Sequence, residues 1–121
     1  MEKVVKLNRG YQDLQVWQKS IDLAQAVYHV TSDFPKQEAY GLTSQMQRAA
    51  VSIASNIAEG SSRGAKEFSR FISISLGSAA ELKTQLIIAI RIQYSNQEKL
   101  EQLLDQTSEI ERMLHGLRRG L

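Results

Sequence analysis

The chain has 121 residues, of which 42% are hydrophobic and 23% charged, as is ordinary for one globular domain with a continuous core. No apolar run reaches the roughly 18 residues of a bilayer span, no signal peptide is evident, and no cysteine is present. We therefore expect a cytoplasmic protein without membrane contact, whose formal charge of +2 permits a nucleic-acid partner without requiring one.

The first predicted helix runs from about residue 13 to 33 and follows residues 1–12, which lack periodicity and are expected to form a flexible basic arm. Residues 13–121 are expected to form the folded domain. Asp13 is the expected N-cap of this helix and Pro35 its stop. Its apolar residues form two stripes at helical spacing, and we assign both to the core. The first is Leu14, Trp17, Ile21, Ala24 and Tyr28, and the second is Val16, Leu23, Val27 and Val30.

The second predicted helix runs from about residue 42 to 59 and has the pattern of a closely packed helix. Alanines at every fourth position, Ala50, Ala54 and Ala58, admit the backbone of another helix. Thr43 or Ser44 is the expected N-cap, and Gly60 is the expected stop. The core stripe consists of Leu42, Met46, Ala49, Ile53 and Ile57.

The third predicted helix, from about residue 65 to 94, is the longest. Gly77 lies in its interior, where glycine costs about 1 kcal/mol relative to alanine, so a close helix–helix contact is expected there. The core stripe consists of Phe68, Phe71, Ile72, Ser75, Ala79, Leu82, Leu86 and Ala89.

The fourth predicted helix runs from about residue 97 to 118, with Asn96 as the expected N-cap. Its apolar positions alternate at spacings of three and four, and no strand pattern competes anywhere in the chain. They are Leu100, Leu103, Thr107, Ile110, Leu114, Leu117 and Leu121. Four helices with short connections predict an all-α protein, an antiparallel up-down-up-down four-helix bundle.

The sequence offers little support for catalysis. His29 and His115 fall late in the first and fourth helices, near opposite ends of an antiparallel bundle. Glu111 shares a helix face with His115, but the Glu-x-x-His motifs of a di-iron bundle are absent. No serine has an adjacent histidine and acid. We therefore expect a non-enzymatic protein with no catalytic, cofactor or metal site; an enzyme or ligand site within the bundle is the least supported alternative.

A polar stripe follows heptad-like spacing beside the core stripe of the second helix. It consists of Gln45, Arg48, Ser52, Asn56 and Glu59, and the third helix has a comparable face with Arg70, Gly77, Glu81 and Gln85. One interpretation is a solvated surface or intrachain ion pairs, worth about 0–1 kcal/mol each when exposed, and composition alone favours it. The other is a network between subunits, in which Arg48 makes a bidentate bond to a carboxylate such as Glu59 or Glu81.

Several segments together resemble one known family, the proteins named for reading frames in intervening sequences of 23S ribosomal RNA genes. The resemblance covers about residues 11 to 119, and Ala54 stands where the family often has proline. The segments are LQVWQKSIDLA (14–24), DFPKQEAYGLTSQMQRAAVSIASNIAEG (33–60), EFSRFISISLGSAAELKTQL (67–86) and MLHGL (113–117).

The resemblance implies a bundle that assembles into a homo-oligomeric ring, typically a pentamer. The fold is also similar to that of accessory proteins of diversity-generating retroelements, which are basic rings that engage a reverse transcriptase and nucleic acid. Since fold alone does not carry function, neither likeness assigns an activity. On this basis we expect a set of polar residues to organise the bundle and its subunit contacts: Gln45, Arg48, Ser52, Asn56, Glu59 and Glu81.

Two functions follow as hypotheses. The first is an oligomer that binds RNA or DNA, or a nucleic-acid-processing protein, through basic patches repeated around the ring. The expected contacts are Lys3, Lys6 and Arg9 on the arm, Arg63, Lys66 and Arg70 near the second turn, and Arg118 and Arg119. The acidic fourth helix and the lack of an aromatic stacking platform count against it. The alternative is a structural ring that engages a protein, such as a reverse transcriptase-like enzyme, without direct nucleic-acid contact.

Overall fold

The protein is a four-helix bundle, described here over residues 10–121 by a computed structural model. No strand occurs in that part of the chain, so the predicted all-α class is confirmed. The 3-10 turns η1 (Gly10–Asp13) and η2 (Lys36–Glu38) precede the first and second long helices. The long helices are α2 (Gln15–Thr31), α3 (Leu42–Ser61), α4 (Ala65–Arg91) and α5 (Gln97–Arg119).

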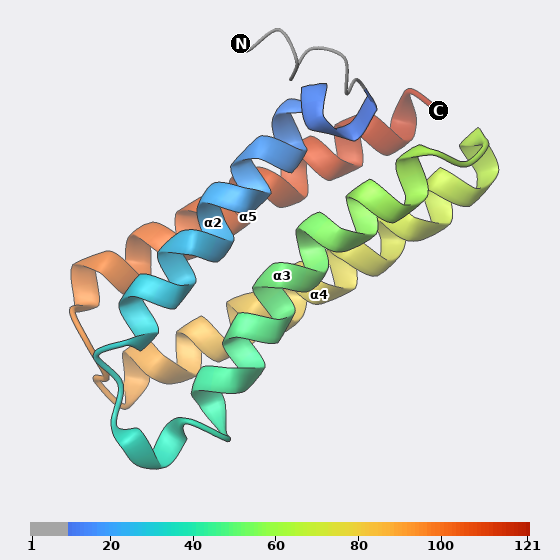
Figure 1. Ribbon diagram of the computed structural model, residues 1–121. Coiled ribbons are helices and arrows are strands. Elements are labelled where there is room, and N and C mark those ends of the chain that lie inside the picture. Colours follow the sequence, from blue (N-terminus) through green and yellow to red (C-terminus); the bar gives the residue numbers. More distant parts are fainter. Residues whose placement is uncertain (1–9) are drawn as a thin grey trace, which may run out of the picture.

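The four helices surround one core (Figure 1). α3 packs against α2 and α4, and α5 packs against the same two helices, whereas no Cα atoms of α2 and α4 within residues 10–121 lie within 8 Å of each other, so these two helices lie diagonally across the core. The α3–α4 turn, η1 and the C-terminal end of α5 lie at one end of the bundle, which we call the turn end. The α2–α3 and α4–α5 connections lie at the other, which we call the loop end.

α2 contributes to the core through the whole of one predicted stripe and part of the other. Val16, Leu23, Val27 and Val30 are buried, and Leu14, Trp17 and Ala24 of the other stripe are partly buried and pack against the core. The assignment of that first stripe to the core was wrong for Ile21 and Tyr28, which are 40% and 50% exposed. Ser20 completes the inner line of α2. It is fully buried, and its hydroxyl donates to the Val16 carbonyl of its own helix at 2.7 Å, which satisfies the hydroxyl. A polar residue at this inner position weakens the apolar pattern of the stripe that faces the core.

α3 and α4 pack closely through small residues. The Ser75 hydroxyl of α4 donates to the Ile53 carbonyl of α3 at 2.9 Å. Gly60 is buried, and a Cβ placed there would lie 2.5 Å from the Phe71 Cβ. α3 continues through Ser61, so Gly60 is not the predicted helix stop. Its small size is required because the phenyl ring of Phe71 fills the space beside it.

The N-terminal ends of the helices confirm one predicted cap and correct two others. Asn96 caps α5 as predicted, with its Oδ1 accepting the Lys99 N–H at 2.9 Å. Asp13 belongs to η1, and α2 has Leu14 at its N-cap position. Neither Thr43 nor Ser44 caps α3, whose first residue lies at Leu42.

The loop end is held by side-chain contacts from two connections. The Glu38 carboxylate accepts the Leu42 N–H at 3.0 Å through one oxygen and the Tyr94 hydroxyl at 2.8 Å through the other. α4 ends at Arg91, three residues before the predicted position, and Gln93 and Ser95 adopt positive φ angles of 61° and 58°. Among the helices within residues 10–121, none has both the length and the apolar character needed to cross a membrane.

Candidate functional site

A polar groove lies between α3 and α4 on the outside of the bundle. We call it the α3–α4 groove; its volume is about 460 Å³, and its lining is Gln45, Arg48, Ala49, Ser52, Glu81 and Gln85. The α3 residues are three and four positions apart, so they share the side of that helix that borders α4. The structure thus places four residues of the predicted polar set around one groove: Gln45, Arg48, Ser52 and Glu81.

Hydrogen bonds across the two helices hold the floor of the α3–α4 groove. The Ser52 and Ser78 hydroxyl oxygens lie 2.8 Å apart, which joins α3 to α4. The Asn56 amide donates to the Ser52 carbonyl at 2.9 Å and to the Ser52 hydroxyl at 3.0 Å. Ser52 and Asn56 therefore act within the chain, where they fix the spacing of the two helices. Ser78 was outside the predicted set, because the register between α3 and α4 that brings it to Ser52 does not follow from helical spacing.

The remaining polar groups of the α3–α4 groove have no partner in the described part of the chain. Arg48 and Glu81 line the same groove, yet neither makes an ion pair or hydrogen bond within residues 10–121. Gln85 is only 9% exposed, and its Oε1 accepts no hydrogen bond there. A buried amide oxygen without a donor costs about 1–3 kcal/mol. The groove thus offers a cation, an anion and a buried acceptor that residues 10–121 leave unmatched.

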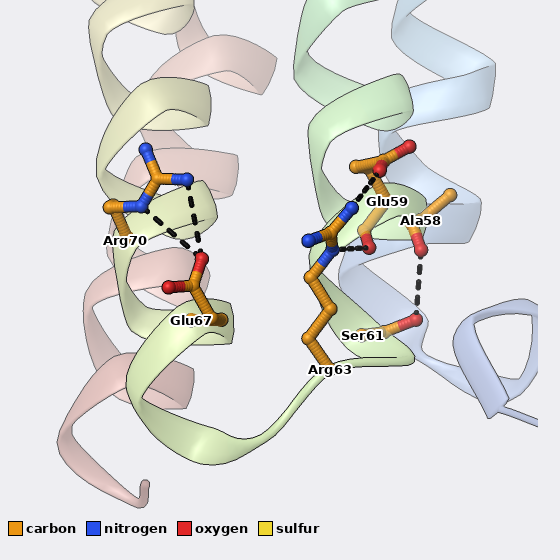
Figure 2. Close-up of polar contacts among 6 residues, drawn as sticks. All are labelled: Ala58, Glu59, Ser61, Arg63, Glu67 and Arg70. Carbon is orange, nitrogen blue, oxygen red and sulfur yellow. Dashed lines mark hydrogen bonds and ion pairs between the residues drawn. The ribbon is translucent and has the colours of Figure 1, made fainter.

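Glu59 does not line the α3–α4 groove. Figure 2 shows it at the turn end, where its carboxylate binds Arg63 and its carbonyl accepts the Arg63 Nε–H at 3.3 Å. The two side chains are i and i+4 near the end of α3, and both are about half exposed. Arg48 and Glu59 are therefore not partners within this chain.

Two arginines of the turn end are held against Phe71. Arg70 donates to Glu67 from both Nε and Nη2, at 3.3 and 3.2 Å (Figure 2). The Arg63 and Arg70 Cζ atoms lie 5.0 and 5.1 Å from the Phe71 ring centroid. Cation–π contacts at exposed sites contribute about 0.5–1 kcal/mol each. These contacts fix the positions of the two guanidinium groups on either side of the α3–α4 turn.

The end of α5 adds further cations to the turn end. Arg118 donates to the Ser73 hydroxyl of α4 at 2.8 Å, and its Nη2 lies 3.2 Å from His115 Nδ1. Lys66 and Arg119 are exposed and make no ion pair within residues 10–121. The structure thus gathers five predicted contact residues at one end, Arg63, Lys66, Arg70, Arg118 and Arg119. The other three, Lys3, Lys6 and Arg9, lie outside the described residues.

Across residues 10–121, no three His, Cys, Asp or Glu side chains are grouped so as to hold a metal ion. The groove and the basic turn end are the two polar features of the surface that combine several predicted residues. Neither contains a histidine paired with an acid and a nucleophile, the arrangement used in triad catalysis.

Known proteins resemble this chain in both sequence and fold. A family model described as 23S rRNA-intervening sequence protein matches residues 12–116. No curated protein sequence matches the chain. A crystal structure of a protein of unknown function from the S23 ribosomal protein family of Bacteroides thetaiotaomicron superimposes with a TM-score of 0.76. It is 25% identical in sequence, and the match covers 85% of this chain and 97% of that one. The chain belongs to the 23S rRNA-intervening sequence protein family.

Proposed function

We propose that this protein is a non-enzymatic, cytoplasmic homo-oligomer that binds the phosphates of nucleic acid through basic surfaces repeated around a ring. Each subunit is an antiparallel up-down-up-down bundle, which the alternation of connections between the two ends supports (Figure 1). Five copies is the number expected from the family resemblance. Self-association uses the α3–α4 groove, where Arg48, Glu81 and the Gln85 Oε1 have no partner within residues 10–121.

The observation that carries nucleic-acid binding is the collection of five cations at the turn end. Within residues 10–121, only two carboxylates, Glu59 and Glu67, pair with them. Two acidic side chains of α5 pair with lysines outside this set: Glu111 binds Lys83 at 2.9 Å, and Glu109 lies 3.6 Å from Lys19. A ring places the turn ends of its copies around one axis, so a modest local charge becomes an extended positive field.

Contact with phosphate explains the chemistry of the turn end better than recognition of bases. Arginine and lysine donate to phosphate oxygens, and Arg63 and Arg70 are already oriented by Phe71 and their carboxylates. Phe71 is only half-buried, but the guanidinium groups of Arg63 and Arg70 lie over its ring, so the ring is not free to stack on a base. Binding is therefore expected to show little sequence preference and a steep dependence on salt.

The test is fluorescence anisotropy with a labelled single-stranded RNA and a DNA of the same sequence, at about 50 and 200 mM salt. The double variant Lys66→Glu with Arg119→Glu should weaken binding more than tenfold and flatten the salt dependence, because both side chains are free at the turn end. The control is Lys36→Glu with Lys99→Glu, which makes the same charge change at the loop end and should bind as the wild type does. No binding by the wild type at the lower salt would contradict the proposal.

A second candidate is a ring that engages a protein partner, such as a reverse transcriptase-like enzyme. The loop end favours it, since Tyr40 is 98% exposed and Ile92 is 48% exposed in the two connections joined by Tyr94 and Glu38. Affinity purification of the tagged protein separates the two candidates. Nucleic acid that survives nuclease-free washing supports the first, whereas a stoichiometric protein without nucleic acid, lost on Tyr40→Asp, supports the second.

A further inference from the structure

The outward face of α4 has a regular pattern that contacts within this chain do not explain. Its residues are exposed and follow spacings of three and four, and Ile74 and Ile88 are 41% and 44% exposed. Part of this face borders a second hollow of about 420 Å³ that shares Gln45, Glu81 and Gln85 with the α3–α4 groove. We call it the α4 outer face: Ile74, Gly77, Glu81, Thr84 and Ile88.

Gly77 is the most informative residue of the α4 outer face. Glycine in a helix interior costs about 1 kcal/mol relative to alanine, and the sequence predicts a close helix contact there. Yet a Cβ added at Gly77 would meet no atom within 4 Å, whereas at Gly60 it would collide with Phe71. No contact of the described chain needs Gly77 to be small. The space beside Gly77 is therefore open to the close approach of another molecule.

A second stripe lies on α2, and contacts within residues 10–121 explain only part of it. It consists of Leu14, Trp17, Ile21, Ala24 and Tyr28, which we call the α2 ridge. Leu14, Trp17 and Ala24 also pack against the core, whereas Ile21 and Tyr28 do not. Helical spacing places these five residues on one flank of α2, beside the buried inner line, and the two largest exposures are 40% at Ile21 and 50% at Tyr28.

The α2 ridge lies on the side of α2 toward α3. The opposite flank of α2, with Lys19, Asp22 and His29, borders hollows shared with α5. On α3, Gln47 donates to Thr31 of α2 at 3.2 Å, and Val51, one turn further along the same side of α3, is 42% exposed. Val51 thus extends the apolar surface of the ridge onto α3.

The two surfaces are complementary in size and in hydrogen bonding. The α2 ridge carries bulky side chains, whereas the α4 outer face includes Gly77, with Ala80 beside it. The Trp17 indole N–H and the Tyr28 hydroxyl are donors for which no acceptor lies within residues 10–121. Gln85 Oε1 is a buried acceptor without a donor, at the border of the groove and the α4 outer face. Each surface supplies what the other lacks.

We propose that the α2 ridge of one copy docks on the α3–α4 groove and the α4 outer face of the next copy. This inference rests on the self-association in the proposed function and specifies its two surfaces. Because the two surfaces differ, the contact is heterologous. It can be repeated from copy to copy until the last copy meets the first and a ring is complete.

The position of the surfaces favours a small ring. Both adjoin α3, on the α2–α3 side and the α3–α4 side of a four-helix bundle, which meet at roughly a right angle. Closed rings of four or five copies require the two contact surfaces of a subunit to face directions about 90° or about 108° apart. An isologous dimer, in contrast, would use one surface twice.

Mixing two assembly-deficient variants tests the inference. Gly77→Gln blocks the α4 outer face and leaves the ridge intact, whereas Ile21→Gln with Tyr28→Gln removes the ridge and leaves the groove intact. Each variant alone should be a monomer by native mass spectrometry and light scattering. Their equimolar mixture should form a heterodimer and nothing larger, because only one competent pair of surfaces remains. Ile87→Gln, at a 43% exposed site on the α5 side of α4, is the matched control and should assemble as the wild type does.

The outcomes separate this inference from the assembly itself. A wild type that stays monomeric contradicts self-association and this inference together. A wild-type oligomer whose mass survives both sets of substitutions contradicts only the surfaces assigned here. If the ridge variant assembles alone and the Gly77→Gln variant does not, the groove pairs with itself and the heterologous contact is wrong. Circular dichroism of each variant checks that the helices persist.

Discussion

The hydroxyl of Tyr94 donates a 2.8 Å hydrogen bond to the carboxylate of Glu38, 56 residues earlier in the chain. The bond joins the α4–α5 connection to the α2–α3 connection at the loop end. The other carboxylate oxygen accepts the Leu42 N–H at the start of α3, and the Phe34 ring packs 5.2 Å from the Tyr94 ring, centroid to centroid. One acidic side chain thus caps a helix and ties together two loops that no backbone ladder connects.

Replacing Tyr94 by phenylalanine should lower the unfolding temperature. The ring keeps its contact with Phe34, so the change removes only the hydroxyl that binds Glu38. Tyr40→Phe is the matched control, because that side chain is 98% exposed and should unfold as the wild type does. Thermal denaturation followed by circular dichroism compares them. Equal unfolding temperatures for all three proteins would show that the bond does not stabilise the loop end.

The same contact makes stability depend on pH. The Leu42 N–H, followed by the Tyr94 hydroxyl, holds the pKa of Glu38 below its usual range. A carboxyl with a lowered folded-state pKa contributes stability that is present above its unfolded pKa and lost as pH falls through the folded one. The stability difference between wild type and Glu38→Gln should therefore narrow below about pH 4.3. Unfolding temperatures measured between about pH 3 and 6 check this, and a difference that stays constant over the range would contradict it.

Tyr94 should make stability depend on pH in the alkaline range as well. Its hydrogen bond to Glu38, then its burial and the Glu38 charge, raise its pKa. The contribution of a group whose folded-state pKa is raised is complete below the unfolded pKa and is lost as pH rises through the folded one. The destabilisation by Tyr94→Phe should consequently shrink above about pH 10. Absorbance titration of the tyrosines, compared between wild type and Tyr94→Phe, identifies the late-titrating group.

The same substitution at two glycines should have opposite effects on the isolated chain. Gly77→Ala is expected to stabilise it by about 0.4–1 kcal/mol, because the new methyl group meets open space and restricts the unfolded chain. Gly60→Ala should destabilise it by about 1–3 kcal/mol, because its Cβ would lie 2.5 Å from the Phe71 Cβ. Urea unfolding at high dilution measures both. Destabilisation by Gly77→Ala under those conditions would show that the chain itself needs the glycine.

Arg48 and Glu59 should behave differently when truncated, although the sequence pattern groups them. Arg48→Ala should leave the stability of the isolated chain within about 0.5 kcal/mol of wild type, because it removes no intrachain ion pair. It should weaken assembly at least tenfold, since Arg48 lines the groove on which we propose that the next copy docks. Glu59→Ala should leave assembly unchanged. It should lower the free energy of unfolding by at most about 1 kcal/mol, because it removes only the exposed ion pair with Arg63. Sedimentation over a concentration series distinguishes the two.

The sequence predicted the helices well and the details of their packing less well. Periodicity located the four helices, and Asn96 was recognised as a cap because its partner is only three residues away. The exposure of Ile21 and Tyr28 on α2 was missed, because helical spacing alone does not separate an inner apolar stripe from one beside it. Glu38 was missed as the α3 cap, since that role depends on a loop folding back and on Tyr94 from a distant connection.

The candidate site was predictable to the extent that it lies on one helix. Spacing alone placed Gln45, Arg48 and Ser52 on a common side of α3. Which α4 residues complete the groove depends on the register between helices, so the importance of buried Gln85 emerged only from the structure. Glu59 fits the same spacing, but a closer cation, Arg63, binds its carboxylate.

Self-association is the claim on which the ring, the repeated basic surface and the paired docking surfaces all depend. The most direct test is the mass of the full-length wild-type protein in solution, measured by light scattering after size exclusion and by native mass spectrometry over a range of concentrations. The account predicts a single closed species of five times the 13.6 kDa chain. A particle of 13.6 kDa at every concentration would contradict it.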